Sequence, residues 1–167
     1  MRTSSFRLIA VAVAAAAAAA AAAPGARAAT ATTTLGVTLT ITAGCTVTAT
    51  AVAFPTSQVL SGNVDATGVV TPTCTNTTPY TIALDQGGGA GATVAARKMT
   101  GPAAATVTYA LYQDAARSTL WGTTGAAAVS AVGNGNAQGT VVYGRVPAQS
   151  SPAPGAYTDV VNVTVTY

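Results

Sequence analysis

The sequence predicts an all-β protein, built as a two-sheet sandwich of immunoglobulin-like type. Beyond residue 30 the chain is dominated by threonine and valine, and β-branched residues favour strands. Short turn signals rich in glycine and proline punctuate this region, and no segment of it shows a helical repeat. About seven strands in roughly 140 residues are typical of such a sandwich.

Residues 1–28 read as a secretory signal peptide that is cleaved. Arg2 and Arg7 give a positive start, an apolar run covers residues 8–23, and Ala26-Arg27-Ala28 is a small-x-small cleavage site. That run is shorter than the ~20 residues of a membrane-spanning helix. We therefore expect export and a mature chain of 139 residues (167 − 28), which is enough for one domain.

Two strictly alternating strands stand near the ends of the mature chain, at residues 35–42 and 161–167. Alternation gives each strand one apolar face that requires a core. The first strand lies at a free terminus, where chains are usually loose. It therefore needs a groove, and the pattern leaves open whether that groove belongs to its own domain or to a neighbour's.

The other expected strands lie between these two. The C-terminal strand is expected to begin at Tyr157, before its alternating part. The full set of expected strands is Leu35–Thr42, Thr46–Ala53, Gly68–Cys74, Tyr80–Asp85, Thr106–Gln113, Gly139–Val146 and Tyr157–Tyr167. The Gly- and Ala-rich stretch from Gly87 to Lys98 is expected to be a mobile connection. It is no phosphate-binding loop, because no Gly-Lys-Ser/Thr follows it.

Cys45 and Cys74 are the only cysteines in the chain. In an oxidising compartment they most simply pair with each other. The closed loop of about 30 residues is worth roughly 3–4 kcal/mol in the chain-entropy model. A catalytic thiol is disfavoured, because the chain has no histidine that could activate it.

The chain contains no histidine and no glutamate, which removes most catalytic designs and any His-based metal site. We expect no enzyme activity, no metal and no cofactor. Four cations and four aspartates balance in the mature chain, so no basic patch for nucleic acid is expected. These residues are Arg97, Lys98, Arg117, Arg145, Asp65, Asp85, Asp114 and Asp159. A near-neutral surface favours self-association.

The aromatic residues allow a second function, binding of carbohydrate. Tyr109, Tyr112 and Trp121 could together form a platform for sugar rings, although packing in the core is the more common use of such residues.

The order of the motifs resembles a known family. An alternating strand ends at Ala43-Gly44-Cys45, and the second cysteine closes a strand at Cys74. Later motifs are residues 79–84 (PYTIAL), 97–99 (RKM), 109–114 (YALYQD), 121–122 (WG), 142–144 (VYG), 154–159 (PGAYTD) and a terminal strand ending in tyrosine. The set resembles the spore coat protein U domain family, which includes the pilins of archaic chaperone–usher pili.

The resemblance implies an incomplete immunoglobulin-like sandwich that lacks its last strand and is completed by donor-strand addition. It implies a signal peptide at 1–28, an N-terminal donor strand at 29–42 and a pilin domain at 43–167. A periplasmic chaperone would fill the groove first, and an outer-membrane usher would exchange it for the next subunit's strand. The product is a head-to-tail fibre of identical or related pilins on the cell surface, for adhesion and biofilm formation.

The resemblance also assigns the site residues. The donor residues are Leu35, Val37, Leu39 and Ile41, and the acceptor groove is lined by Val161, Val163, Val165 and Tyr167. Four buried apolar side chains contribute at most roughly 6–12 kcal/mol, which is comparable to a whole domain's stability of about 5–15 kcal/mol. The alternative is a self-contained secreted module, such as a spore-coat component, closed by its own N-terminal strand.

Overall fold

The computed structural model describes residues 28–167, so the expected signal peptide lies, apart from Ala28, outside the described residues. The chain forms two units, Met1–Leu39 and Thr40–Tyr167. In the first unit, residues 28–39 form no regular element and are exposed throughout. The expected strand Leu35–Thr42 is therefore absent from the single chain, since a strand forms only where a second strand pairs with it.

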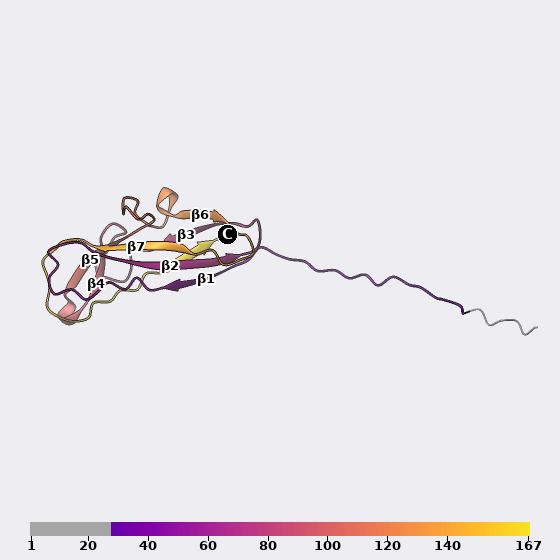
Figure 1. Cartoon of the computed structure of the whole chain (residues 1–167), viewed down its shortest axis with the longest axis horizontal. Coiled ribbons are helices and arrows are strands. Elements are labelled where there is room, and N and C mark those ends of the chain that lie inside the picture. Colours follow the sequence, from indigo (N-terminus) through magenta and orange to yellow (C-terminus); the bar gives the residue numbers. More distant parts are fainter. Residues whose placement is uncertain (1–27) are drawn as a thin grey trace, which may run out of the picture. The chain divides into compact units, whose positions relative to one another are not determined.

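The second unit contains two antiparallel sheets, and the predicted all-β two-sheet architecture is confirmed (Figure 1). The larger sheet has the strand order β1-β2-β7-β5-β4 and the smaller one the order β6-β3-β8. The strands are β1 (Cys45–Thr50), β2 (Val64–Cys74), β3 (Pro79–Leu84), β4 (Arg97–Thr100), β5 (Thr106–Tyr112), β6 (Val129–Val132), β7 (Thr140–Val146) and β8 (Val163–Thr166), with 3-10 turns η1 (Pro102–Ala104) and η2 (Gly125–Ala127).

The core lies between the inward faces of the two sheets. The alternation of β2 and β3 explains it, because every second residue is buried in β3 and, from Gly68 onward, in β2. The buried apolar residues are Val70, Cys74, Tyr80, Ile82, Leu84, Val107, Tyr109, Ala110, Leu111, Trp121, Val142 and Val146.

The structure corrects the expected strands in several places. β1 ends at Thr50 rather than at Ala53, and β2 begins at Val64 rather than at Gly68. β4 and β6 were not anticipated, and Arg97 and Lys98 belong to β4 rather than to a connection. The terminal strand is shorter than Tyr157–Tyr167, because regular pairing with β3 begins only at Val163. Before it, Thr158 pairs instead with Thr100 at the end of β4.

Candidate functional site: an open apolar groove

β8 is an edge strand. In the part of the chain that the structure describes, it pairs with β3 and with no other strand. Val161, Val163 and Val165 pack against the core and are partly buried. The apolar side chains of the alternating segment therefore face inward, as they do in an ordinary core strand. The other edge of β8 presents backbone N–H and C=O groups that another strand can bind.

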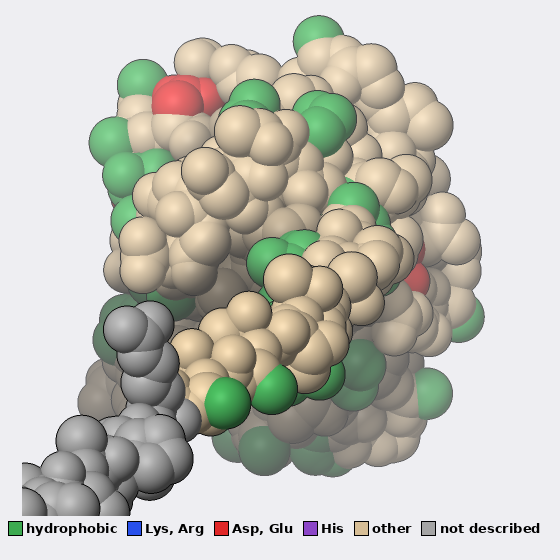
Figure 2. All heavy atoms as spheres, turned by 90° about the vertical axis from the view of Figure 1, so that its right-hand side faces the viewer, with side chains coloured by type: hydrophobic (Ala, Val, Ile, Leu, Met, Phe, Trp, Pro, Cys, Tyr) green, Lys and Arg blue, Asp and Glu red, His purple; other side chains and the backbone are tan. Residues whose placement is uncertain are grey.

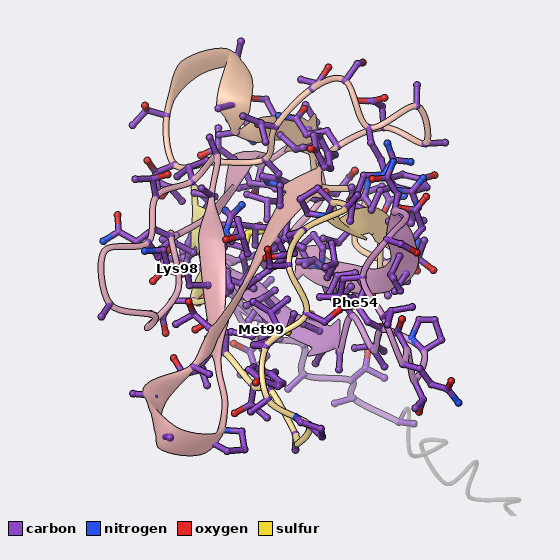
Figure 3. All side chains as sticks on the ribbon, turned by 90° about the vertical axis from the view of Figure 1, so that its left-hand side faces the viewer. Phe54, Lys98 and Met99 are labelled. Carbon is purple, nitrogen blue, oxygen red and sulfur yellow. A yellow bond between two sulfur atoms is a disulfide. The ribbon has the colours of Figure 1, made fainter. Side chains whose placement is uncertain are left out.

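A hollow of about 500 Å³ lies beside this strand. One wall is the C-terminal segment with Val161 and Val163, and the opposite wall is the end of β1 with the residues that follow it, including Val52 and Phe54. Figure 3 views the molecule from the end where these groups gather and places Phe54 and Met99 on either side of the yellow C-terminal segment. We call this hollow the groove.

The floor of the groove is apolar and comes from both sheets. It is formed by Val70, Leu84, Met99, Tyr109, Leu111 and Val142. Five of these six side chains belong to the buried core, so the groove opens directly onto the core. A lining of this kind suits a row of apolar side chains far better than a charged ligand.

Two aspartates lie where the C-terminal segment enters the groove. Asp159 lines the groove, and its carboxylate accepts hydrogen bonds from Tyr109 Oη (2.7 Å) and from the backbone N–H groups of Gly88 and Val160 (2.8 Å each). Asp85, at the end of β3, accepts from the backbone N–H of Asn162 (3.0 Å), from Asn162 Nδ2 (2.6 Å) and from the N–H of Gly87 (2.9 Å).

The pKa values of nearby groups follow from these contacts. Burial opposes ionisation of Asp85, but the hydrogen bonds from Asn162 and Gly87 outweigh it and hold the pKa of Asp85 below its ordinary value. Burial, together with the Asp159 carboxylate, raises the pKa of the Tyr109 hydroxyl, so Tyr109 stays a hydrogen-bond donor.

Arg97 lies beneath this end of the groove with no exposed surface. Its guanidinium donates to four backbone carbonyls, those of Asp85 (2.8 Å), Val94 (2.9 Å), Leu84 (3.2 Å) and Trp121 (2.7 Å). Burial lowers the pKa of Arg97. The side chain thus joins the end of β3, the loop before β4 and the segment after β5, which together support the groove.

The residues predicted as donors share one property, a very high exposure. Leu35, Val37, Leu39 and Ile41 are 88, 86, 85 and 78% exposed. Figure 2 shows hydrophobic side chains along one side of the segment that follows the grey residues. A row of four large apolar side chains in water is unusual for a monomeric protein.

The residues predicted to line the groove are only partly brought together. Val161 and Val163 line it, whereas Val165 packs against the core outside the hollow. Tyr167 is 60% exposed and contributes to a second, shallower hollow with Tyr80 and Val132. Their role as an acceptor row stays a prediction. The opposite wall around Val52 and Phe54 was missed, although Ala49–Phe54 is recognisable as a mainly apolar run.

The predicted disulfide is confirmed, since Cys45 and Cys74 are bonded. It joins the first residue of β1 to the last residue of β2, which face each other in the ladder.

The prediction that Tyr109, Tyr112 and Trp121 form a platform for sugar rings is wrong. Trp121 has no exposed surface and its indole N–H donates to the Ile82 carbonyl (3.0 Å). Tyr109 is also buried, so two of the three rings cannot meet a sugar.

Residues 28–167 contain no cluster of three or more His, Cys, Asp or Glu side chains that could hold a metal ion. Within the same residues, no helix is both long and apolar enough for a transmembrane span.

Comparison with known proteins identifies the family. Residues 31–164 match the model of the Spore Coat Protein U domain, and the chain belongs to this family. The resemblance seen in the order of the motifs is thereby confirmed. Among curated proteins, no sequence matches the chain.

A solved structure shares the fold. It is a crystal structure of the CsuC–CsuE chaperone–tip adhesion subunit pre-assembly complex, from archaic chaperone-usher Csu pili of Acinetobacter baumannii. The similarity has a TM-score of 0.58 at 20% identity and covers 77% of this chain and 41% of the solved chain. The chain thus spans less than half the length of its structural relative, and the likeness concerns the fold.

Proposed function

We propose that the chain is a structural subunit of an archaic chaperone–usher pilus, which polymerises by donor-strand exchange into a surface fibre for adhesion and biofilm formation. One observation carries the proposal. A single chain holds both an apolar groove beside an unpaired strand edge and, separately, an exposed strand-like segment with four alternating apolar side chains. The groove lacks a strand, and the exposed segment can supply one to the groove of another subunit.

The chain geometry at Gly44 favours donation to a neighbour over self-closure. Gly44 stays beside the residue that follows β2, because its N–H donates to Thr75 Oγ1 (3.2 Å) and its carbonyl accepts from the Thr75 N–H (2.9 Å). To lie beside its own β1, the donor segment would have to reverse just before Cys45. A two-residue hairpin turn needs at least one positive φ, and neither Ala43 nor Gly44 has one. If the chain reversed earlier, Ile41 would lie in the turn and could not be part of the donor strand.

Strand directions favour one polarity for the proposed fibre. β1 starts at the disulfide and is antiparallel to β2, and β3 leads away from that end, so β8, antiparallel to β3, runs back toward it. A donor strand antiparallel to β8 enters at the disulfide end and leaves near Asp159. Its own domain follows there, and the two neighbours of each subunit occupy opposite ends. The opposite direction would crowd both neighbours at the disulfide end.

Two partners act before the fibre forms. Before assembly a periplasmic chaperone covers the groove, and an outer-membrane usher replaces it with the donor strand of the next subunit. The similarity to a chaperone–subunit complex supports the first partner. Because head-to-tail donation is a heterologous contact that does not close, the product is an open filament.

The experiment compares two substitutions in the exposed segment. Leu39→Asp places a charge on the apolar face and should abolish polymers of the mature chain on a sizing column. Thr38→Asp places the same charge on the polar face of the segment and should leave polymers intact. Both residues are exposed in the single chain, so neither change should unfold the domain, and circular dichroism checks this. Polymers of the Leu39→Asp variant, or a wild-type chain that stays a stable monomer, would refute the proposal.

A further inference from the structure

The wall of the groove contains a stretch with little regular pairing. Thr158 exchanges two backbone hydrogen bonds with Thr100 (2.8 and 3.1 Å), and regular pairing of β8 with β3 starts at Val163. Between these points, residues 159–162 have one backbone contact across strands, from the Asp85 N–H to the Asn162 carbonyl (3.2 Å). Side chains must therefore hold this stretch.

Asp159 is an acidic residue in a row of inward-facing apolar ones. Its neighbours in that row, Tyr157, Val161 and Val163, also line the groove. Its carboxylate ties the stretch to β5 through Tyr109 and to the loop after β3 through Gly88. Gly87 comes so close that a Cβ there would overlap the carboxylate, and its φ of 81° also favours glycine.

Asp85 holds the other end of the same stretch. Its two carboxylate oxygens bind the backbone and the side chain of Asn162, and one of them also binds the Gly87 N–H. Asp85 and Asp159, which we call the aspartate pair, thus connect the loop Gly87–Gly88 to residues 159–162 from opposite sides. Both carboxylates accept bonds from backbone N–H groups, which are stronger than bonds between neutral partners.

We propose that the aspartate pair positions residues 158–162 so that the empty groove is ready to receive a strand. The inference rests on the proposed function and deepens it. An incoming strand would bind the free edge of this stretch, and an acceptor that is only fractionally in the competent conformation binds with correspondingly reduced apparent affinity. The pair keeps that fraction high before the missing strand arrives.

The test uses the full mature chain with Leu39→Asp, whose own donor segment is disabled and whose groove is intact. A fluorescent peptide of residues 30–42 is added, and its association rate is measured by anisotropy. Adding Asp85→Asn and Asp159→Asn should slow association about tenfold, in proportion to the loss of competent acceptor. Asp65→Asn is the matched control, because Asp65 is bound by Arg145 (2.8 Å) and does not line the groove. The control should keep the rate within about twofold.

The readouts separate this role from a merely structural one. If the pair only stabilises the fold, the variant lowers the melting temperature of both the empty and the peptide-filled chain and leaves the association rate unchanged, which overturns the inference. If the Leu39→Asp chain itself binds no peptide, the proposed function fails instead. Should the double variant not fold, Tyr109→Phe removes one donor to Asp159 while keeping the ring, and it should slow association about threefold. An unchanged rate there also overturns the inference.

Discussion

Arg97 shows what one buried charge does in this core. Among residues 28–167, the guanidinium has no carboxylate partner in hydrogen-bond range and instead donates to four carbonyls from three different segments. A planar group with five donors fits this task, whereas a lysine offers a single point charge. Backbone carbonyls that lose such a donor stay buried and unsatisfied.

Replacing this side chain should therefore destabilise the domain severely. We expect Arg97→Leu to lower the free energy of unfolding by about 3 kcal/mol or more, since several buried acceptors are left without partners. Urea unfolding of the Leu39→Asp monomer measures it. The neighbouring Lys98→Leu is the control, because Lys98 makes one exposed bond to the Ala90 carbonyl, and its effect should stay within about 0.5 kcal/mol. Equal effects of the two changes would contradict this account of Arg97.

At the scale of elements, the junction of β3 with the segment before β8 is held by an ionised group. The pKa of Asp85 is lower in the folded than in the unfolded chain. Its contribution to stability is therefore present above the unfolded value of about 3.9 and is lost as the pH falls through the folded value. The free energy of unfolding should drop below about pH 4, and Asp85→Asn should flatten that drop. Unfolding curves at several pH values test this, and an unaltered pH profile in the variant would contradict it.

The elements also show which parts of the fold the sequence could predict. β2, β3, β5 and β7 were anticipated because runs of valine, threonine and aromatic residues alternate there over six or more residues. β4 and β6 were missed, since each has only four residues and β4 begins with Arg97 and Lys98. Their strand state depends on pairing with β5 and β3, which local sequence does not encode.

The residues of the candidate site also fall into those that local sequence predicts and those that it does not. The apolar rows at Leu35–Ile41 and Val161–Val165 are recognisable from strand periodicity, and their roles as donor and acceptor stay predictions. The opposite wall at Phe54 and the roles of Asp85 and Asp159 depend on which segments meet in space. Likewise nothing local to Trp121 distinguishes an indole in the core from one at the surface.

For the whole molecule, the proposed linkage predicts how chain growth stops. A Leu39→Asp subunit can accept a donor strand but cannot give one, so it can stand only at one end of a filament. Mixing one such subunit with nine wild-type subunits should limit filaments to about ten subunits, because an open head-to-tail chain has one growth contact per subunit. Sizing of mixtures at several ratios measures this. Filament lengths independent of the ratio would indicate a different mode of assembly.

The position of the disulfide has a mechanical consequence for such a filament. Tension along the fibre would reach each domain through Gly44 and enter β1 at Cys45, its first residue. There the bond to Cys74 passes the force covalently into β2, which pairs with both β1 and β7 in the larger sheet. β1 of a pulled subunit would therefore be held covalently at its first residue and could not be peeled from β2 starting at that end.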